Sequence, residues 1–288
     1  MRIGVGLPAG VPGVDGHLLI EWARLADTGP FSSLGVVDRL CYDTFDPLVA
    51  LASAAAVTQR TRLVTMIIIG PLYNTLRLAK ASASIDALSG GRLVLGMAVG
   101  ARREDYEAAG IEYRSRGKRF VEQLSLLRAY WEDPAIGPSP AHPEGPPVLV
   151  GGQNDQVFTR IARYANGYVH GGGPPRSFAR AADKTRAAWS DMRRPGKPQL
   201  WAQAYFALGD EDDLLSGERY LKEYYAFTGT FAEKVASGLL TTPQAIAQYI
   251  RGYAEAGCDE LVLLPTVASL DQLKRLAEVL AGIDYERF

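Results

Sequence analysis

The apolar and polar positions of this chain follow two patterns in turn, one typical of buried strands and the other of amphipathic helices. Residues 62–104 show both. Residues 63–69 form a continuous apolar run rich in β-branched residues, which predicts a strand buried on both faces. Apolar residues then recur at helical spacing over 76–88, and a second apolar run covers 93–99. This segment therefore predicts a strand–helix–strand unit whose strands are parallel.

Glycine, proline and capping residues mark where these elements begin and end. Gly70-Pro71 follows the first strand, and Ser89-Gly90-Gly91 ends the helix with glycines that can adopt positive φ. Asp46-Pro47 predicts a helix start, with Asp46 as N-cap and Pro47 at the first helical position. Residues 133–147 are rich in proline and predict an irregular surface loop, because strand–helix alternation resumes directly after them.

The same alternation extends over the whole chain and gives eight strands. They are predicted at residues 2–7, 34–37, 63–69, 93–99, 148–150, 167–169, 200–208 and 260–264. Helices are predicted at 18–26, 46–58, 76–88, 104–110, 118–132, 157–165, 177–192, 218–237, 242–256 and 270–280. This order predicts a (β/α)₈ barrel, with residues 1–288 as one domain. A doubly wound sheet of two halves is the rival, but no composition break or clear linker divides the chain.

Composition narrows the class of protein. The 288 residues are 47% hydrophobic and 22% charged, as expected of a soluble enzyme with a sizeable core. A net charge of −1 favours neither nucleic acid nor an anionic membrane as a partner, and no apolar run approaches the roughly 18 residues that cross a bilayer. Cys41 and Cys258 form no CxxC pair, which predicts reduced thiols and a cytoplasmic location. The three histidines lack metal-ligand spacing, so no metal site is expected.

The active site of such a barrel lies at the carboxyl ends of its strands. These ends are rich in glycine and lack paired carboxylates, histidine clusters, a GxSxG motif and a Walker loop. They hold Asp38-Arg39, Gly70 to Tyr73, Gly100-Ala101-Arg102, Gly151-Gly152-Gln153, His170-Gly171-Gly172 and Tyr205. A mouth of this kind suits a bulky planar cofactor, approached by bare backbone, better than it suits hydrolysis.

Gly151-Gly152-Gln153, between a strand and a helix, is the candidate phosphate site. Glycines let amide groups approach an anion closely, and the helix start offers unpaired N–H groups at the positive end of its dipole. The alternative is a tight turn in which Asn154 or Asp155 caps the helix.

Asp38 and His170 are the candidate catalytic side chains. Asp38 is placed to accept a hydrogen bond from a cofactor ring or a substrate, and the alternative is a structural pair with Arg39, Arg62 or another base. His170 is a candidate general acid or base because its unperturbed pKa lies near neutrality, and the alternative is a structural histidine. Four arginines near strand exits are candidates for binding an anionic cofactor tail, namely Arg102, Arg103, Arg176 and Arg180.

Four segments resemble the luciferase-like family of flavin- and deazaflavin-dependent oxidoreductases. They are LGVVDRL at 34–40, LAKASASIDALSGGRLVLGMAVGARREDYEAAG at 78–110, RGKRFVEQLSLLRAYW at 116–131 and PPVLVGGQNDQVFTRIARYANGYV at 146–169. The second is the most specific, because one signature joins a helix, a glycine turn and a strand. The resemblance implies a (β/α)₈ barrel, usually dimeric, with a flavin or deazaflavin ring at the carboxyl ends of the strands.

The resemblance also implies roles for single residues. Asp38 matches the family's aspartate after the second strand, and Ile67-Ile68 lies near a bulge that backs the ring, often with a non-prolyl cis peptide. Gly100-Ala101 would line the ring, while Gly151-Gly152 with Gln153 would bind the phosphate. Two positions depart from the family pattern. Asn74-Thr75 replaces Asn-Pro or His-Pro, and Arg39 stands where histidine is common.

The expected function is hydride transfer between the deazaflavin coenzyme F420 and a small organic substrate, which the Asp38 signature and the compact length favour. The first alternative is a monooxygenase that uses reduced FMN and O₂. The second is a flavin-binding protein without turnover. A cofactor-free lyase or hydrolase would need paired acids or a metal cluster at the mouth. We also expect a homodimer that packs through the helices at 46–58 and 75–88.

Overall fold

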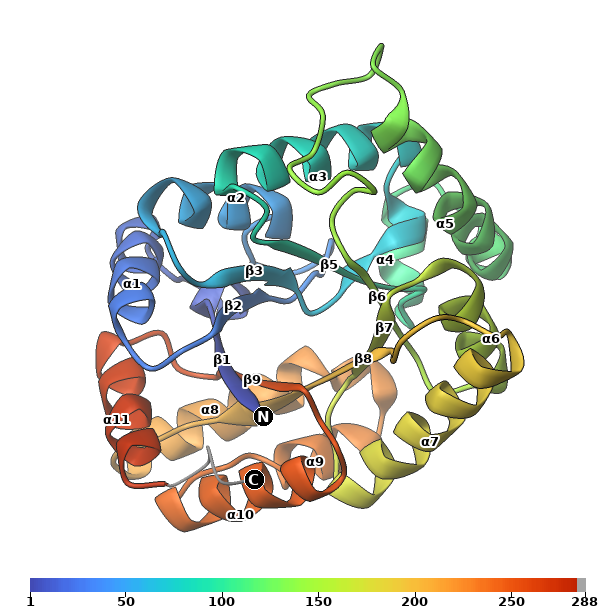
Figure 1. Ribbon diagram of the computed structural model, residues 1–288. Helices are drawn as coiled ribbons and strands as arrows, with labels where there is room; N and C mark the ends of the chain where they lie inside the picture. The colour runs from blue at the N-terminus through green and yellow to red at the C-terminus, as the bar shows by residue number, and fades with distance from the viewer. Residues whose placement is uncertain (284–288) are drawn as a thin grey trace.

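The computed structural model describes residues 1–283, whose strands form a closed parallel barrel surrounded by helices (Figure 1). The sheet order is β3-β2-β1-β9-β8-β7-β6-β5-β4, and pairing of β3 with β5 closes the ring. The strands are β1 (Arg2–Gly6), β2 (Ser33–Val36), β3 (Arg62–Thr65), β4 (Ile68–Ile69), β5 (Leu93–Ala98), β6 (Val148–Gly151), β7 (Gly167–His170), β8 (Gln199–Phe206) and β9 (Glu260–Pro265). Because β3 and β4 are two pieces of one strand, the barrel has the eight strands that the sequence predicts.

The helices follow the strands in the expected order. They are α1 (Gly16–Thr28), α2 (Pro47–Val57), α3 (Thr75–Ser89), α4 (Arg103–Ala108), α5 (Arg116–Glu132), α6 (Asp155–Tyr164), α7 (Pro175–Asp191), α8 (Glu211–Tyr224), α9 (Phe231–Ala236), α10 (Pro243–Glu255) and α11 (Leu270–Ala281). Local capping sets several of their ends. Asp46 accepts hydrogen bonds from the amides of Leu48 and Val49, and Gly90 ends α3 at a φ of 67°, as predicted.

The third strand differs from its prediction. The apolar run at 63–69 predicts one continuous strand, but the structure breaks it between β3 and β4, around a cis peptide bond that joins Met66 to Ile67. Leu63 pairs with Leu93, whereas Ile68 pairs with Met97, so both pieces run beside β5. The break lies at the bulge that the resemblance implies near Ile67-Ile68.

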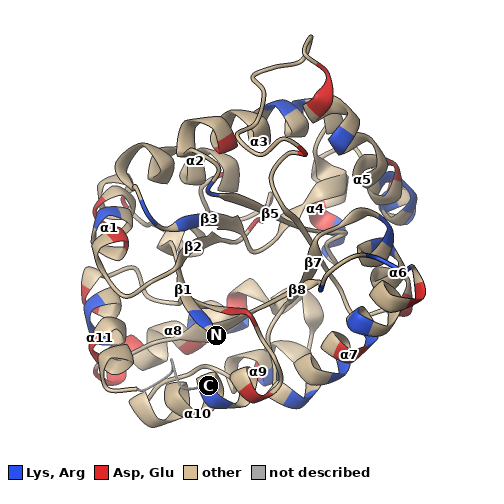
Figure 2. Ribbon diagram, in the orientation of Figure 1, with Lys and Arg blue, Asp and Glu red and all other residues tan. Residues whose placement is uncertain are grey.

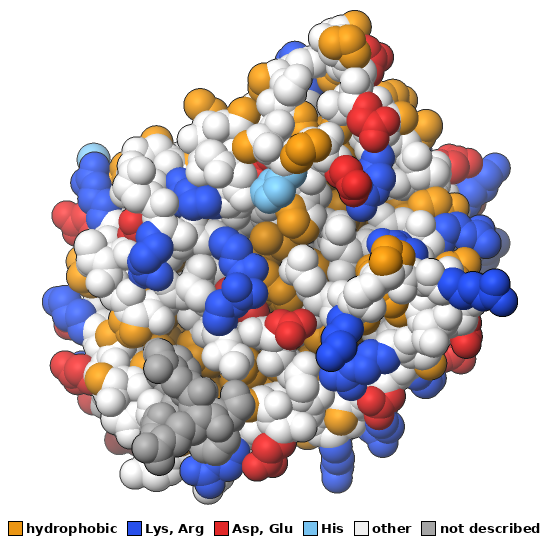
Figure 3. All heavy atoms as spheres, in the orientation of Figure 1, with side chains coloured by type: hydrophobic (Ala, Val, Ile, Leu, Met, Phe, Trp, Pro, Cys, Tyr) orange, Lys and Arg blue, Asp and Glu red, His pale blue; other side chains and the backbone are white. Residues whose placement is uncertain are grey.

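Side chains fill the space on both sides of the strands. One buried cluster joins the strands to the surrounding helices, and it includes Leu34, Leu63, Leu93 and Phe178. A second cluster fills the interior of the barrel with residues such as Val64, Val94, Leu149, Trp201 and Val262. Charged residues lie mainly on the surrounding helices and loops, and few lie on the strands (Figure 2). On the face shown in Figure 3, acidic and basic side chains lie both along the outline and around the apolar side chains near the centre.

The interior cluster continues past the carboxyl end of the barrel into the segment between β8 and β9. Tyr220 and Tyr224 of α8 pack with Tyr205 of β8, and with Met66 and Leu264, which stand at the ends of other strands. The helix in this segment begins at Glu211, earlier than the predicted residue 218, because Asp210 accepts a hydrogen bond from the amide of Asp213. The segment therefore covers part of the barrel mouth.

The proline-rich residues 133–147 form the irregular loop that the sequence predicts, and it projects beside α3 and α5 (Figure 1). Lys80 donates hydrogen bonds to the carbonyls of Ile136 and Gly137, and the buried Asp86 accepts one from the amide of His142. Across residues 1–283, no helix combines the length and the apolar character needed to cross a bilayer.

Candidate functional site

Asp38 stands at the carboxyl end of β2 and bridges to the interrupted third strand. Its Oδ2 atom accepts a hydrogen bond of 2.7 Å from the amide of Ile69, the last residue of β4. The hydroxyl of Tyr73 hydrogen-bonds both Asp38 and Asp46, which caps α2. These contacts fix the carboxyl group at the barrel mouth, beside the bulge that follows Met66.

The environment of Asp38 favours its protonated form. Burial raises the pKa of this carboxyl from 3.8 to about 7, and the nearby charges of Asp46 and Asp105 act in the same direction. The hydrogen bond from the Ile69 amide opposes this shift but does not cancel it. Asp38 is therefore close to half ionised at neutral pH, which is the condition in which a carboxyl group can exchange a proton or a hydrogen bond with a ligand.

Neither of the two arginines named as structural partners of Asp38, Arg39 and Arg62, pairs with it. Arg39 turns away and donates a hydrogen bond of 2.6 Å to the backbone carbonyl of Tyr224. Arg62 pairs with the fully buried Glu260, at the opposite end of the barrel where the strands begin. Within residues 1–283, neither arginine therefore forms an ion pair that would lower the pKa of Asp38.

Gly100 follows β5. It leaves the backbone without a side chain next to β4, the strand whose Ile69 amide donates a hydrogen bond to Asp38. Its φ is 66°, and a Cβ atom there would lie 2.6 Å from Cγ2 of Ile69, so only glycine fits. Ala101, which follows it, is exposed. Ile67 is partly buried and packs against the interior cluster. The residues that the resemblance assigns to the cofactor ring, from Ile67 to Ala101, therefore do meet at one side of the mouth.

The second glycine loop, after β6, leads into the N-terminus of α6. Gly152 has a φ of 140°, and a Cβ atom there would lie 2.6 Å from Val157 Cγ2. Gln153 is exposed. The capping expected under the alternative interpretation is absent, because Asn154 makes no side-chain cap and Asp155 instead pairs with Lys184 at 2.7 Å. The first amides of α6 therefore keep their capacity to bind an anion.

His170 ends β7 and lies next to this loop. The hydroxyl of Tyr168 is 2.9 Å from His170 Nδ1 and 3.1 Å from the carbonyl oxygen of Gly152, so it links the histidine to the glycine loop. Burial lowers the pKa of His170 to about 4, with a smaller opposing effect from the backbone of Gly172. His170 is therefore neutral near pH 7 and lacks the second ring proton that an imidazolium gives up as a general acid. Its proposed catalytic role stays a prediction.

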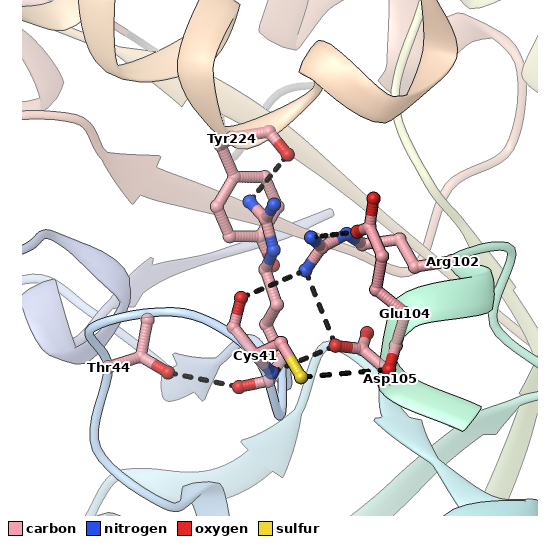
Figure 4. A network of polar contacts seen from close by, with 7 residues as sticks. Cys41, Thr44, Arg102, Glu104, Asp105 and Tyr224 are labelled. Atoms are coloured by element: carbon pink, nitrogen blue, oxygen red, sulfur yellow. Dashed lines mark hydrogen bonds and ion pairs between the residues drawn. The ribbon is translucent and has the colours of Figure 1, made fainter. Parts of the chain in front are cut away.

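Arg102 does not extend freely toward a ligand. Its guanidinium pairs with Glu104 and, at 3.3 Å, with the buried Asp105, and it also donates to the carbonyl of Cys41 (Figure 4). Asp105 in turn accepts a hydrogen bond of 2.8 Å from the Cys41 amide. This network fixes the loop after β2 against the loop after β5. Among the predicted tail-binding arginines, Arg103, Arg176 and Arg180 are exposed instead.

Sequence reasoning missed how the aromatic residues of distant segments combine. Tyr205, Tyr220 and Tyr224 form one buried cluster over the mouth. The partly buried Tyr225 packs against it, and the hydroxyls of Tyr205 and Tyr225 are 2.8 Å apart. The run of aromatics at 220–227 is visible in the sequence, but its position over the barrel is not. Trp201 of β8 belongs to the core, because it is fully buried and stacks on Arg62.

Comparison with known proteins agrees with this arrangement. The model of the luciferase-like monooxygenase family matches residues 1–257. An uncharacterised protein of Mycobacterium tuberculosis is 33% identical over 190 residues, a match that covers 54% of this chain and 66% of that protein. The oxygenase component of a flavin-dependent trigonelline monooxygenase of Acinetobacter baylyi is 28% identical over 119 residues, which cover 40% of this chain and 33% of the relative. The matches thus span less than two thirds of either relative's length.

Two solved structures share the whole fold. An F420-dependent secondary alcohol dehydrogenase, in complex with an F420–acetone adduct, has a TM-score of 0.79 at 14% identity, covering 98% of each chain. The oxygenating constituent of 3,6-diketocamphane monooxygenase from Pseudomonas putida, in complex with FMN, has a TM-score of 0.74 at 15% identity, covering 97% of this chain and 96% of the other. Identities this low show the likeness of fold alone.

The raised pKa of Asp38 predicts a specific dependence of stability on pH. Between about pH 4 and pH 7 the unfolded chain loses this proton while the folded protein keeps it, so the free energy of unfolding falls as pH rises through that window and then levels off. Asp38→Asn cannot titrate, and its unfolding free energy should rise relative to that of the wild type over the same window. Urea unfolding at a series of pH values measures both.

Asp27 provides a control of opposite sign. Burial alone would raise its pKa, but hydrogen bonds from Gln59, Thr61 and Arg60 outweigh burial and lower it to about 2. Asp27→Asn should therefore have a lower free energy of unfolding than the wild type. This difference should be constant near neutral pH and shrink as pH falls toward about 2. If wild type and Asp38→Asn gave parallel curves from pH 4 to 7, the pKa of Asp38 would not be raised.

Proposed function

The chain belongs to the luciferase-like monooxygenase family, and on that premise we propose that it is a deazaflavin-dependent oxidoreductase. It would transfer a hydride between F420 and a small organic substrate at the carboxyl ends of the barrel strands. The bare backbone at two strand exits is the observation that carries this proposal. Gly100 and Gly152 both lie where a Cβ atom would clash with a neighbouring side chain, so both strand exits present backbone without a side chain.

The residues at the mouth fit such a cofactor. Ile67, Gly100 and Ala101 would hold its ring, and Gly151, Gly152 and Gln153 would hold its phosphate at the uncapped start of α6. The bound deazaflavin would supply a carbon centre that accepts or donates hydride. Asp38, near half ionisation at neutral pH, would accept a hydrogen bond from the ring or the substrate when it is charged. The similarity of fold to an F420-dependent alcohol dehydrogenase supports this choice.

A monooxygenase that uses reduced FMN and O₂ is the second candidate. The buried tyrosine cluster over the mouth favours it, because chemistry with oxygen and a reduced flavin needs a site that excludes water. Similarity of fold to a monooxygenase that binds FMN also supports it. A flavin-binding protein without turnover is the third candidate, and cofactor oxidation that depends on substrate would eliminate it. The free thiols of Cys41 and Cys258 suit a cytoplasmic location.

We also propose that the protein is a twofold dimer that packs through α2 and α3. Val49 on α2 is 61% exposed and Leu76 on α3 is 44% exposed, which are high values for aliphatic side chains. A groove between these helices is lined by Leu48, Leu78 and Ala81, among others. Burying this surface against a second copy would remove the apolar groups from water.

Cofactor titrations test the proposed function. Equilibrium binding of F420 and FMN is measured side by side at low and at high salt. We expect F420 to bind more tightly, and its affinity to fall as salt rises, because Arg103, Arg176 and Arg180 would contact its anionic tail where salt screens charge. Tight binding of FMN together with undetectable binding of F420 would contradict the proposal and favour the monooxygenase.

The phosphate site predicts a second result. Gln153→Glu places a negative charge in front of α6 without disturbing packing, because Gln153 is exposed. We expect it to weaken the binding of FMN and F420 by roughly three- to tenfold, because the Glu carboxylate would repel the phosphate, and two like charges about 4 Å apart in water repel by about 1 kcal/mol. Riboflavin, which lacks the phosphate, should bind wild type and variant alike. Gln244→Glu, in the first turn of α10, is the matched control, and equal loss in both variants would remove this loop from the site.

The dimer proposal predicts the effect of charge at its interface. Sedimentation velocity at micromolar concentration should show a dimer for the wild type and a monomer for the double variant Val49→Lys, Leu76→Lys. Leu215→Lys on α8 is the control, because Leu215 is also half exposed, at 50%, but lies outside α2 and α3. A wild-type monomer, or a dimer that survives the double change, would contradict this interface.

A further inference from the structure

Arg39 is a buried cation without a carboxylate partner at the barrel mouth. Only 7% of its surface is exposed, and within residues 1–283 it forms no salt bridge. Its one side-chain hydrogen bond runs from Nη1 to the carbonyl of Tyr224, while Nε is buried and makes none. Removing a charge from water is costly unless a partner of opposite charge compensates it. This arginine is therefore incompletely satisfied.

The geometry around Arg39 leaves one edge of its guanidinium for a ligand. The rings of Tyr42 and Tyr224 flank the group, with centroids 4.0 and 4.5 Å from its central carbon. Nη1 is occupied by Tyr224, so Nε and Nη2 form the unused side. Two parallel N–H groups on one edge match the two oxygens of a carboxylate. The hydroxyl of Tyr42 is also buried and without a partner.

The neighbouring charges select a monoanion. Glu104 and Asp105 are occupied by Arg102, so they do not compensate Arg39 by contact. They and Asp38 would nevertheless repel a dianion such as a phosphate monoester. Arg39 also follows β2, which β3 and β5 separate from β6 and its glycine loop in the strand order. Its position therefore suits the substrate, and not the cofactor phosphate that we assign to α6.

We propose that Arg39 binds a carboxylate of the substrate, and that the substrates are small monocarboxylates with an aromatic or otherwise apolar body. This proposal rests on the proposed function, because it names the substrate class of the same mouth. The tyrosines supply the apolar walls: Tyr225 stacks on Phe227 and packs edge-on against Tyr224. A carboxylate on Arg39 would place the rest of the molecule among these rings, on the side of the mouth that also holds Asp38.

The rival explanation is that Arg39 only fastens α8 to the loop after β2. Stacking on Tyr42 and Tyr224 and the bond to the Tyr224 carbonyl would serve that purpose without any ligand. A purely structural arginine would lower the melting temperature when replaced. It would not make the wild-type protein distinguish a carboxylate from the amide of the same shape.

Matched ligand pairs separate these explanations. Calorimetric titration of the full chain compares benzoate with benzamide and 2-naphthoate with 2-naphthamide, and phenyl phosphate is the dianionic probe. We expect at least one carboxylate to bind about tenfold or more tightly than its amide, because a bidentate charge-assisted pair is lost in the amide. The proposal would be overturned if neither carboxylate bound, or if both bound less than about threefold more tightly than their amides. Tighter binding of phenyl phosphate than of benzoate would also overturn it.

Variants of Arg39 test whether this residue causes the preference for a carboxylate over its amide. Arg39→Met should bind the carboxylate and the amide equally, and Arg39→Lys should keep only part of the preference, since it keeps the charge but loses the paired N–H groups. Arg24→Met is the control, because Arg24 is exposed on α1, and it should discriminate like the wild type. Preserved discrimination in Arg39→Met would overturn the assignment. Cofactor titration on the same samples distinguishes failure of this inference from failure of the proposed function. A protein that binds cofactor but does not discriminate between carboxylate and amide refutes only this inference.

Discussion

Side chains must fill the interior of a closed parallel barrel. The other features of this protein depend on how this packing ends at the carboxyl ends of the strands. Alternate residues of the strands, such as Val64, Val94, Leu149 and Val262, occupy the centre. At the carboxyl end the filling does not stop with the strands, because tyrosines of α8 continue it. The mouth is therefore a boundary between a packed interior and an aromatic cover. Polar groups placed there lose water without gaining a full set of partners.

That boundary explains the chemistry of Asp38 and of Arg39. Both residues follow β2, but different interactions compensate each of them for the loss of water. Asp38 keeps its proton at pH values where an exposed carboxyl would lose it, because burial outweighs the stabilisation of its charge by the Ile69 amide and the Tyr73 hydroxyl. Arg39 stays a cation by stacking between two tyrosines and bonding a carbonyl. A bound ligand could complete either group, which is how a site of this kind gains affinity and selectivity.

The sequence predicted those parts of the structure that local chemistry determines. Asp46-Pro47 and Gly90 end helices through their own geometry, and the strand order follows from alternating apolar runs. The break after Met66 could not be derived from periodicity, because no glycine or proline interrupts the run from 63 to 69, and only the family resemblance pointed to it. The bond from Arg39 to Tyr224 joins residues 185 positions apart, and no local pattern reports such a contact. The low pKa of His170 likewise depends on burial that only the folded chain creates.

The central claim is that the carboxyl ends of the strands form the cofactor site. Hydrogen–deuterium exchange with and without F420 tests it directly over the whole chain. The account predicts slower exchange at residues 66–70, 99–102 and 151–154, with little change around the hollow at the other end of the barrel, which Arg2, Lys197 and Trp201 line. Protection confined to that hollow, or none at any of the strand exits under saturating F420, would contradict the account.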